Sequence, residues 1–175
     1  VIKATMEFIV DNYCSPTSSG IPASAGHSAK NCSQHWCHGY PGLVAVLLKA
    51  HEVFDDEKFM AAARHCADVV WRLGMLRKGR GLCHGAFGNS YSFAAMFRHT
   101  KEAKYLQRCH RFVDVSSTNV EYLASVQSYD DPQRKVGNTP DAPWSLMEGA
   151  AGEVCLLADL LVPESAYFIG ADVCN

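Results

Sequence analysis

The sequence predicts an all-α chain in which pairs of helices, one inner and one outer, are repeated. The segments 36–42 (WCHGYPG) and 82–88 (LCHGAFG) are nearly the same, and each opens onto an apolar run. A third segment, 147–152 (MEGAAG), keeps the glycines and lacks the cysteine and the histidine. Such self-similarity is typical of repeat folds, and no segment reads convincingly as a strand.

The first repeat follows the first motif. Residues 43–54 (LVAVLLKAHEVF) are apolar almost all round, which predicts a buried inner helix. Asp55 and Asp56 then supply an N-cap for 57–73, an amphipathic stretch that predicts an outer helix ending at Gly74. The side chains expected on its inward face are Phe59, Ala63, Cys66, Val70 and Leu73.

The same pattern continues along the chain. Residues 88–97 predict the second inner helix and 101–113 the second outer helix, and the third inner helix is expected at 149–162, ended by Pro163. A further helix is expected at 1–13. Two long polar loops are predicted at 15–35 and 116–139, and the start of the second is able to extend the helix before it.

Equivalent glycines begin the three inner helices, at Gly39, Gly85 and Gly149. We therefore expect these helices to run roughly parallel, with their N-termini at one end of the molecule. A Gly-x-x-Gly start allows close backbone approach and leaves N–H groups at the helix N-terminus that favour a thiolate or another anion. A functional site is expected at these N-termini.

Composition excludes several kinds of partner. The net charge is −2 with no basic block, so nucleic acid is not expected as a partner. No apolar run reaches the roughly 20 residues of a membrane span.

The chain lacks an initial Met and a signal peptide and opens inside a predicted helix, so we expect a piece of a longer protein. The placement of its eight cysteines favours a reduced, intracellular compartment over a disulfide framework.

The paired Cys-His-Gly motifs predict a metal centre. Zinc takes cysteine thiolates and histidine nitrogens, and a catalytic zinc keeps three protein ligands and one open position. Stacked repeats bring equivalent positions side by side, so Cys37, Cys83 and His84 make such a set. A closed site that adds His38 is an alternative, with Cys32 as a reserve ligand. The competing interpretation is that the two pairs arose by repeat duplication and only pack.

Other polar and aromatic residues carry weaker predictions. Lys78, five residues before Cys83, is either a solvated loop charge or a cation that holds an anionic substrate near the metal. Glu148 is expected to cap the third inner helix or to pair with its dipole. Core or rim packing is expected for Trp36, Tyr91 and Trp144. Surface or helix roles, rather than metal binding, are expected for His27, His35, His51, His65, His99 and His110.

Longer stretches carry a family resemblance. HWCHGYPG, ADVVW, KGRGLCHGAFGNSYSF and TPDAPWSLMEGAAGEVCLLADLLVPESAYF resemble the C-terminal part of the LanC-like proteins, eukaryotic relatives of the bacterial lanthionine cyclases. The resemblance runs from about Cys32 to Phe168. It implies an α/α toroid of inner and outer helices, similar to the six-hairpin glycosidases. Residues 1–175 would then be the C-terminal part of a single toroid domain, a partial toroid of about three repeats.

The resemblance also implies a site and a chemistry. The family's zinc ligands correspond to Cys37, Cys83 and His84, whereas His38 is not a ligand in the family. Glutathione is the thiol that eukaryotic members add to dehydroalanine or dehydrobutyrine residues of peptides or proteins, giving thioethers. The family's glutathione contacts correspond to Lys78, Asn138, Thr139, Pro140 and Asp141, with Asn138 standing where relatives tend to have arginine.

The resemblance places the family's acid–base residues, a histidine and an aspartate, upstream of this chain. The expected parent is therefore a glutathione-adding enzyme, and the isolated chain is expected to be inactive. The alternative is a non-catalytic, zinc-stabilised helical module that binds glutathione or a protein, such as a kinase or a membrane-associated partner. The expected location is the cytoplasm, with the periphery of the plasma membrane as a second location.

Overall fold

The computed structural model describes residues 1–22, 24, 32–127 and 144–169, and these residues form helices, turns and loops without any strand. The predicted all-α class is confirmed. The helices are α1 (Ile2–Tyr13), α2 (Tyr40–Phe54), α3 (Glu57–Leu73), α4 (Ala86–Thr100), α5 (Ala103–Thr118), α6 (Val120–Gln127) and α7 (Ala150–Asp159), followed by the short 3-10 helix η3 (Pro163–Ser165).

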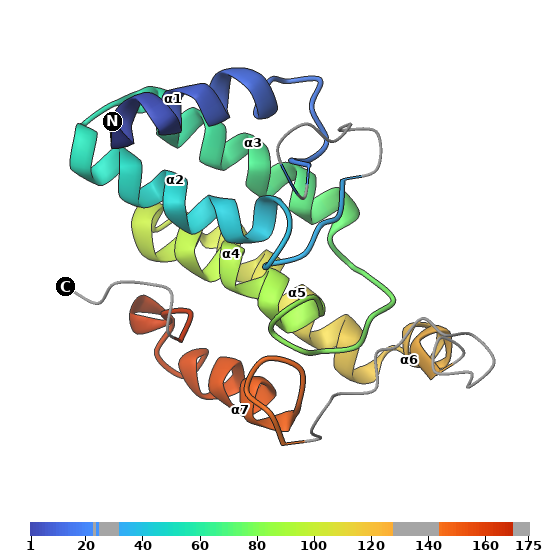
Figure 1. Cartoon of the computed structure of the whole chain (residues 1–175). Coiled ribbons are helices and arrows are strands. Elements are labelled where there is room, and N and C mark those ends of the chain that lie inside the picture. The colour runs from blue at the N-terminus through green and yellow to red at the C-terminus, as the bar shows by residue number, and fades with distance from the viewer. Residues whose placement is uncertain (23, 25–31, 128–143, 170–175) are drawn as a thin grey trace.

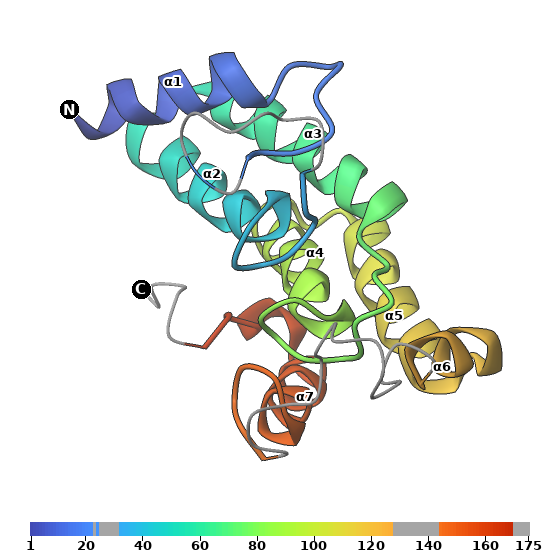
Figure 2. The ribbon, with the colours of Figure 1, turned by 45° about the vertical axis from the view of Figure 1, so that its right-hand side comes forward.

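The inner helices α2, α4 and α7 run in the same direction, with their N-termini at one end (Figures 1 and 2). The prediction of parallel inner helices is therefore confirmed. The outer helices α3 and α5 run back in the opposite direction, α3 packing mainly on α2 and α5 on α4. Each helix pair is a hairpin, and the short α1 lies against α2. This arrangement collects the loops before α2, α4 and α7 at one end.

The central inner helix α4 is the most enclosed element. Every residue from Ala86 to Met96 is buried, because neighbouring helices cover α4 on several sides. Phe93 meets Phe112 of α5 edge to face, with ring centroids 5.0 Å apart. By contrast, α2 is covered mainly by α3 and α4, with α1 against it as well, and its Val46 and Val53 remain 50% and 61% exposed. The expectation that α2 is buried all round was wrong for that face.

The helix boundaries follow the capping residues. The Asp56 carboxylate accepts the N–H of Lys58 at 3.1 Å, and α3 ends at Gly74, as predicted. Asp55 instead ends α2 in a left-handed conformation with φ of 49°. Because α3 has this polar cap at one end and a glycine at the other, its observed bounds are the predicted ones.

Several expectations need correction. The helix α6 was not predicted; the Asn119 side chain accepts the N–H of Tyr122 and so starts a new helix after α5. Helix α7 ends at Asp159 rather than at 162, and Pro163 instead opens η3. Leu73 was expected on the inward face of α3 and Trp144 in the core or at its rim, yet they are 51% and 79% exposed. The part of the predicted loop that falls at 128–139 lies outside the described residues.

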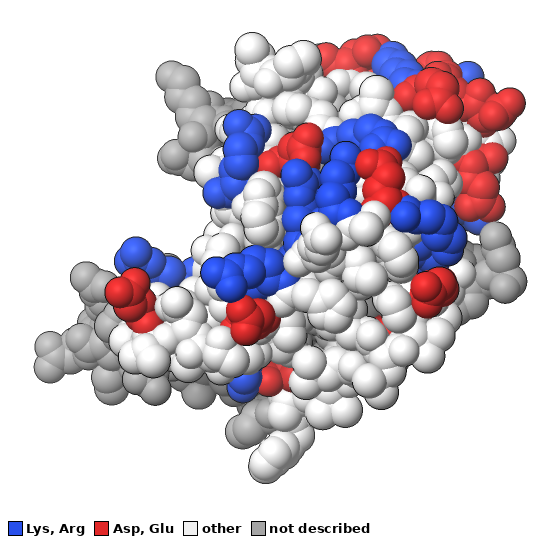
Figure 3. Space-filling model, turned by 180° about the vertical axis from the view of Figure 1, so that it is seen from behind, with Lys and Arg blue, Asp and Glu red and all other residues white. Residues whose placement is uncertain are grey.

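The outer surface formed by α3 and α5 carries interleaved basic and acidic side chains (Figure 3). Ion pairs join the two helices or neighbouring turns: Arg108 with Asp68 at 2.6 Å, Arg111 with Asp114 at 2.9 Å, and Lys104 with Glu102 at 2.8 Å. The surface therefore has mixed charge rather than one basic patch. Among the described residues no helix is long and apolar enough to cross a membrane.

Candidate metal centre

The loops that precede the three inner helices are stacked through backbone hydrogen bonds. The N–H of Cys37 donates to the carbonyl of Cys83 at 3.2 Å, and the N–H of Cys83 donates to the carbonyl of Met147 at 2.8 Å. These three residues occupy the same position in successive repeats, two residues before the glycine at which each inner helix starts. The repeat register therefore brings the Cys37 and Cys83 backbones together.

A second glycine fixes each loop against its own helix. A Cβ atom at any of these glycines would lie too close to the carbonyl oxygen of the residue six positions earlier. The distances are 2.2 Å from Gly42 to Trp36, 1.7 Å from Gly88 to Leu82 and 2.1 Å from Gly152 to Leu146. No side chain fits at such distances, so the Gly-x-x-Gly spacing reflects one close approach that is used three times. The first glycines, Gly39, Gly85 and Gly149, are the N-caps of α2, α4 and α7.

The stacked loops bring three predicted side chains together. The Cys37 and Cys83 sulfurs and a ring nitrogen of His84 all lie within 4.8 Å of one another. A tetrahedral zinc with bonds of about 2.3 Å to sulfur and 2.0–2.1 Å to nitrogen holds its ligand atoms roughly 3.5–3.8 Å apart. Small side-chain rotations therefore suffice for one ion, and two thiols with an imidazole are donors that suit zinc.

The electrostatics of the thiol pair also suit a cation. Burial raises the pKa of Cys83 to about 12, and the neighbouring Cys37 thiol and the Glu148 carboxylate act in the same direction, against Lys78. Two thiolates at this distance repel each other and are stable together only beside a strong positive charge. A divalent ion supplies that charge and removes the thiol protons.

Glu148 takes a place beside His84 that was not predicted. It stands in the third repeat where His84 stands in the second, and its Oε1 lies 3.9 Å from His84 Nε2. Of its two predicted roles, capping α7 is wrong, because Gly149 is the N-cap and no side chain caps the helix, whereas pairing with the helix dipole stays a prediction. At this distance the two groups are too far apart for a hydrogen bond, so Glu148 adds negative charge beside the possible ligands.

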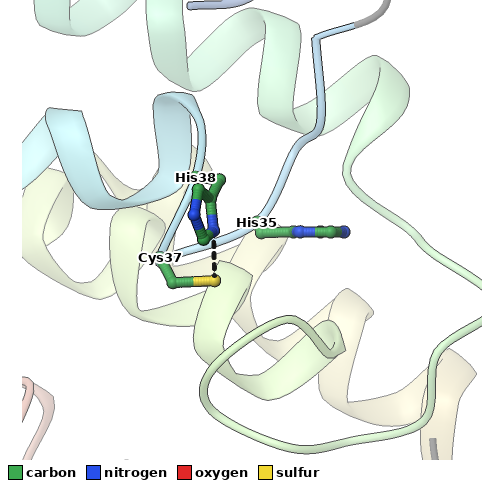
Figure 4. A group of neighbouring side chains, drawn as sticks. All are labelled: His35, Cys37 and His38. Carbon is green, nitrogen blue, oxygen red and sulfur yellow. Dashed lines mark hydrogen bonds between the residues drawn. The ribbon is translucent and has the colours of Figure 1, made fainter. Parts of the chain in front are cut away.

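A second group of potential ligands overlaps the first at Cys37. His35, Cys37 and His38 also have ligating atoms within 4.8 Å of one another (Figure 4). His38 Nδ1 lies 3.0 Å from Cys37 Sγ, and the N–H of His35 donates to the His38 carbonyl at 3.3 Å. His38 was expected as an alternative ligand, whereas His35 was assigned to the surface histidines. Within the described part of the chain, neither group includes Cys32.

His35 is the residue of this site that the sequence analysis missed. It is partly buried, and its ring centroid lies 5.6 Å from that of His84. Burial, together with the charges of the nearby Lys78, His84 and His38, lowers the pKa of His35 to about 4. The spacing of His35, two residues before Cys37, was the one available signal.

The loop between α3 and α4 places Lys78 near the thiols. The Lys78 charge acts on the pKa of both His35 and Cys83, which places it within electrostatic range of the centre. The Tyr122 hydroxyl of α6 holds this loop by donating to the carbonyls of Leu76 at 2.7 Å and Gly79 at 3.1 Å. The other residues expected to bind glutathione, Asn138, Thr139, Pro140 and Asp141, lie outside the described residues.

An aromatic stack holds the residue before Cys37. The rings of Trp36 and Phe168 are 4.0 Å apart and 2° from parallel, and Phe168 also meets Tyr91 of α4 at 5.0 Å. The Arg98 guanidinium donates to the Ala166 carbonyl and lies over the Tyr167 ring at 3.9 Å. The segment after η3 is thus anchored to α4 and supports the first motif. The expected core or rim packing of Trp36 and Tyr91 is confirmed: Tyr91 lies in the core and Trp36 packs against it.

Replacing Phe168 with leucine is expected to lower the free energy of unfolding by about 1–2 kcal/mol, because the ring stack is lost while most of the volume remains. Bound metal is also expected to leave the protein faster, since Trp36 no longer fixes the backbone before Cys37. Urea unfolding and the rate of metal loss to a chelator measure the two effects. Ile169→Ala, at a 46% exposed neighbour, is the control. If the Phe168→Leu variant loses metal at the wild-type rate, the ring stack does not help to hold the metal centre.

Comparison with known proteins assigns the chain to a family. Residues 1–173 match the family model described as lanthionine synthetase C-like protein. The chain belongs to this family. The predicted membership of the LanC-like family is therefore confirmed.

Two relatives extend the comparison of this LanC-like chain. It is 40% identical over 150 residues to a Danio rerio protein named glutathione S-transferase LANCL1, an alignment that covers 86% of this chain and 34% of the relative. It is 31% identical over 173 residues to LanC-like protein GCL1 of Arabidopsis thaliana, covering 98% of this chain and 37% of that protein. The chain thus spans about a third of the length of both relatives.

Proposed function

We propose that this chain is the zinc-binding, C-terminal part of a LanC-like enzyme that adds glutathione to dehydroalanine or dehydrobutyrine residues of peptides or proteins. The observation that carries the proposal is the meeting of Cys37, Cys83 and His84 within 4.8 Å at the N-terminal end of the inner helices. Support comes from a relative that is named a glutathione S-transferase. In this proposal the inner and outer helices of the chain belong to a single α/α toroid, of which about three repeats are present.

The proposed reaction is the addition of a thiol across a carbon–carbon double bond. The sulfur–carbon bond forms at the β-carbon of the dehydro residue, the π bond breaks, and the proton lost by the thiol is balanced by one gained at the α-carbon. Zinc held by Cys37, Cys83 and His84 would lower the pKa of the glutathione thiol, so that it is a thiolate at neutral pH. The acid–base groups are assigned to parts of the relatives that this chain does not span.

The residues around the centre have distinct roles in this proposal. Glu148, 3.9 Å from the His84 ring, adds negative charge beside the metal ligands, and the Trp36–Phe168 stack fixes the backbone before Cys37. Lys78, whose charge reaches both Cys83 and His35, attracts a carboxylate of glutathione to the mouth of the site. The Asn138–Asp141 segment is proposed to contact the rest of the glutathione molecule.

Replacing Lys78 with alanine is expected to weaken glutathione binding about tenfold, because one cation is removed from a partly solvated carboxylate contact worth about 1–2 kcal/mol. Removing zinc is expected to cost more, since the free thiol is mostly protonated at neutral pH. Calorimetric titration of the zinc-loaded chain, the Lys78→Ala variant and metal-free protein measures both effects. Arg111→Ala removes an equal charge from the exposed outer side of α5 and is expected to bind normally.

S-methylglutathione separates this proposal from its alternative. It keeps both carboxylates and has no thiol proton to lose, so it is expected to bind far more weakly than glutathione. Equal binding of the two compounds, together with no effect of metal removal, would contradict thiol activation. The chain would then be better described as a non-catalytic module that binds glutathione or a protein.

A further inference from the structure

Two histidines meet at the end of the inner helices that is opposite the Cys–His centre. His51 lies in the last turn of α2 and His99 in the last turn of α4. His51 Nδ1 is 3.1 Å from His99 Nε2, with the ring centroids 5.2 Å apart and the ring planes at 72°. The helix ends that carry them lie on the side where α2 turns into α3 (Figure 1). The pair therefore joins two inner helices of successive repeats.

A carboxylate of α3 lies beside the His51 ring. Glu57, in the first turn of α3, places its Oε1 3.1 Å from His51 Nε2. An ionised carboxylate only accepts hydrogen bonds, so His51 Nε2 donates to Glu57, whose side chain is 88% exposed; in the tautomer with this hydrogen on Nε2 the lone pair sits on Nδ1. That lone pair faces His99. A carboxylate, a histidine and a second donor in this order recur around metal ions bound by proteins.

The surroundings of the pair favour a cation. The C-terminal ends of α2 and α4 both reach this place, and helix C-termini carry partial negative charge. Burial and the neighbouring His51 and Arg98 lower the pKa of His99, against the Glu52 carboxylate, which raises it. His51 is itself shielded, with its side chain 19% exposed. One of the two facing nitrogens carries the hydrogen of their 3.1 Å hydrogen bond, and a bound ion would take the place of that hydrogen.

We propose that His51 Nδ1 and His99 Nε2 bind a divalent transition-metal ion such as Ni²⁺ or Zn²⁺, with Glu57 orienting the His51 ring. Metal–nitrogen bonds of about 2.0–2.1 Å at angles of 90–109° set two nitrogens roughly 2.9–3.4 Å apart, a range that includes the observed distance. Imidazole nitrogen suits these ions, whereas Ca²⁺ and Mg²⁺ prefer oxygen. The remaining positions would be filled by water. The ion clamps the ends of two inner helices, independently of the proposed thiol chemistry.

The test is a Ni²⁺ titration of tag-free, zinc-loaded chain by calorimetry. Zinc loading occupies the Cys37–Cys83–His84 centre first, so that added Ni²⁺ reports on other sites. His51→Gln and His99→Gln are each expected to weaken Ni²⁺ binding at least tenfold, because a single imidazole remains. His110→Gln, on the exposed side of α5, is expected to leave it unchanged. Equal Ni²⁺ affinity in the wild type and both pair variants would overturn the proposal.

A second measurement uses the unmodified sequence and so does not depend on how the variants fold. Diethylpyrocarbonate modifies accessible imidazole nitrogens, and mass spectrometry of peptides reports the extent at each histidine. Added Ni²⁺ is expected to protect His51 and His99 at least fivefold, while His110 reacts as before. Equal modification of His51 and His99 with and without Ni²⁺ would contradict the proposed metal site, and the pair would then only be a hydrogen bond between two helices.

Discussion

Replacing Cys83 and His84 together with alanine is expected to abolish stoichiometric zinc binding. Two of the three donors that meet within 4.8 Å are removed, and the remaining Cys37 is exposed. Structural zinc sites contribute about 10–16 kcal/mol of apparent binding free energy, so the loss of two ligands is a large effect. Elemental analysis after dialysis measures it. Cys155→Ala, which removes a partly buried cysteine of α7, is the control and should keep its zinc.

The overlapping group at Cys37 allows a sharper comparison. His35→Ala combined with His38→Ala removes as many donors and leaves Cys37, Cys83 and His84 in place. This variant is expected to retain one zinc per chain. If it loses zinc while the Cys83→Ala, His84→Ala variant keeps it, the ion belongs to the His35–Cys37–His38 group instead.

The second large effect is expected from Gly88→Ala. The added Cβ would lie 1.7 Å from the Leu82 carbonyl oxygen, so the loop that carries Cys83 and His84 must move off the start of α4. We expect a loss of about 3 kcal/mol or more in the free energy of unfolding, because α4 is the central buried helix. Zinc occupancy should fall with it. Urea unfolding followed by circular dichroism gives the first number.

Two other glycines provide a graded control for that result. The corresponding Cβ distance is 2.2 Å at Gly42, to the Trp36 carbonyl, and 3.1 Å at Gly81, to the Glu148 backbone. The destabilisation is expected to decrease from Gly88→Ala through Gly42→Ala to Gly81→Ala. Wild-type stability of the Gly88→Ala variant would show that the close approach of loop and helix does not hold the centre.

The sequence predicted much of this fold because its signals were local. Helix α3 has an aspartate cap, an amphipathic pattern and a terminal glycine, and its bounds were predicted at both ends. The equivalence of the repeats predicted that Cys37 and Cys83 lie side by side, and the backbone hydrogen bond between them has this origin. Helix α6 is short and follows α5 after a single residue, so the sequence has no polar stretch between them that would indicate a separate helix.

Features that depend on loop conformation were not predictable in this way. His35 reaches the centre because the chain turns back between His35 and His38, and its spacing from Cys37 alone does not require that turn. Glu148 meets His84 only because the third loop stacks on the second. His51 and His99 come together through the packing of α2 on α4, which fixes the rotation of both helices. In each case tertiary packing, rather than local pattern, decides the contact.

X-ray absorption at the zinc edge is the most direct test of the central claim, that Cys37, Cys83 and His84 hold a zinc that takes up glutathione sulfur. The predicted first shell of the purified, zinc-loaded chain has two sulfurs at about 2.3 Å and nitrogen or oxygen neighbours at about 2.0–2.1 Å. Glutathione is expected to raise the sulfur number from two to three, and S-methylglutathione to leave it at two. A shell without sulfur, or a sulfur number that glutathione does not change, would contradict the account.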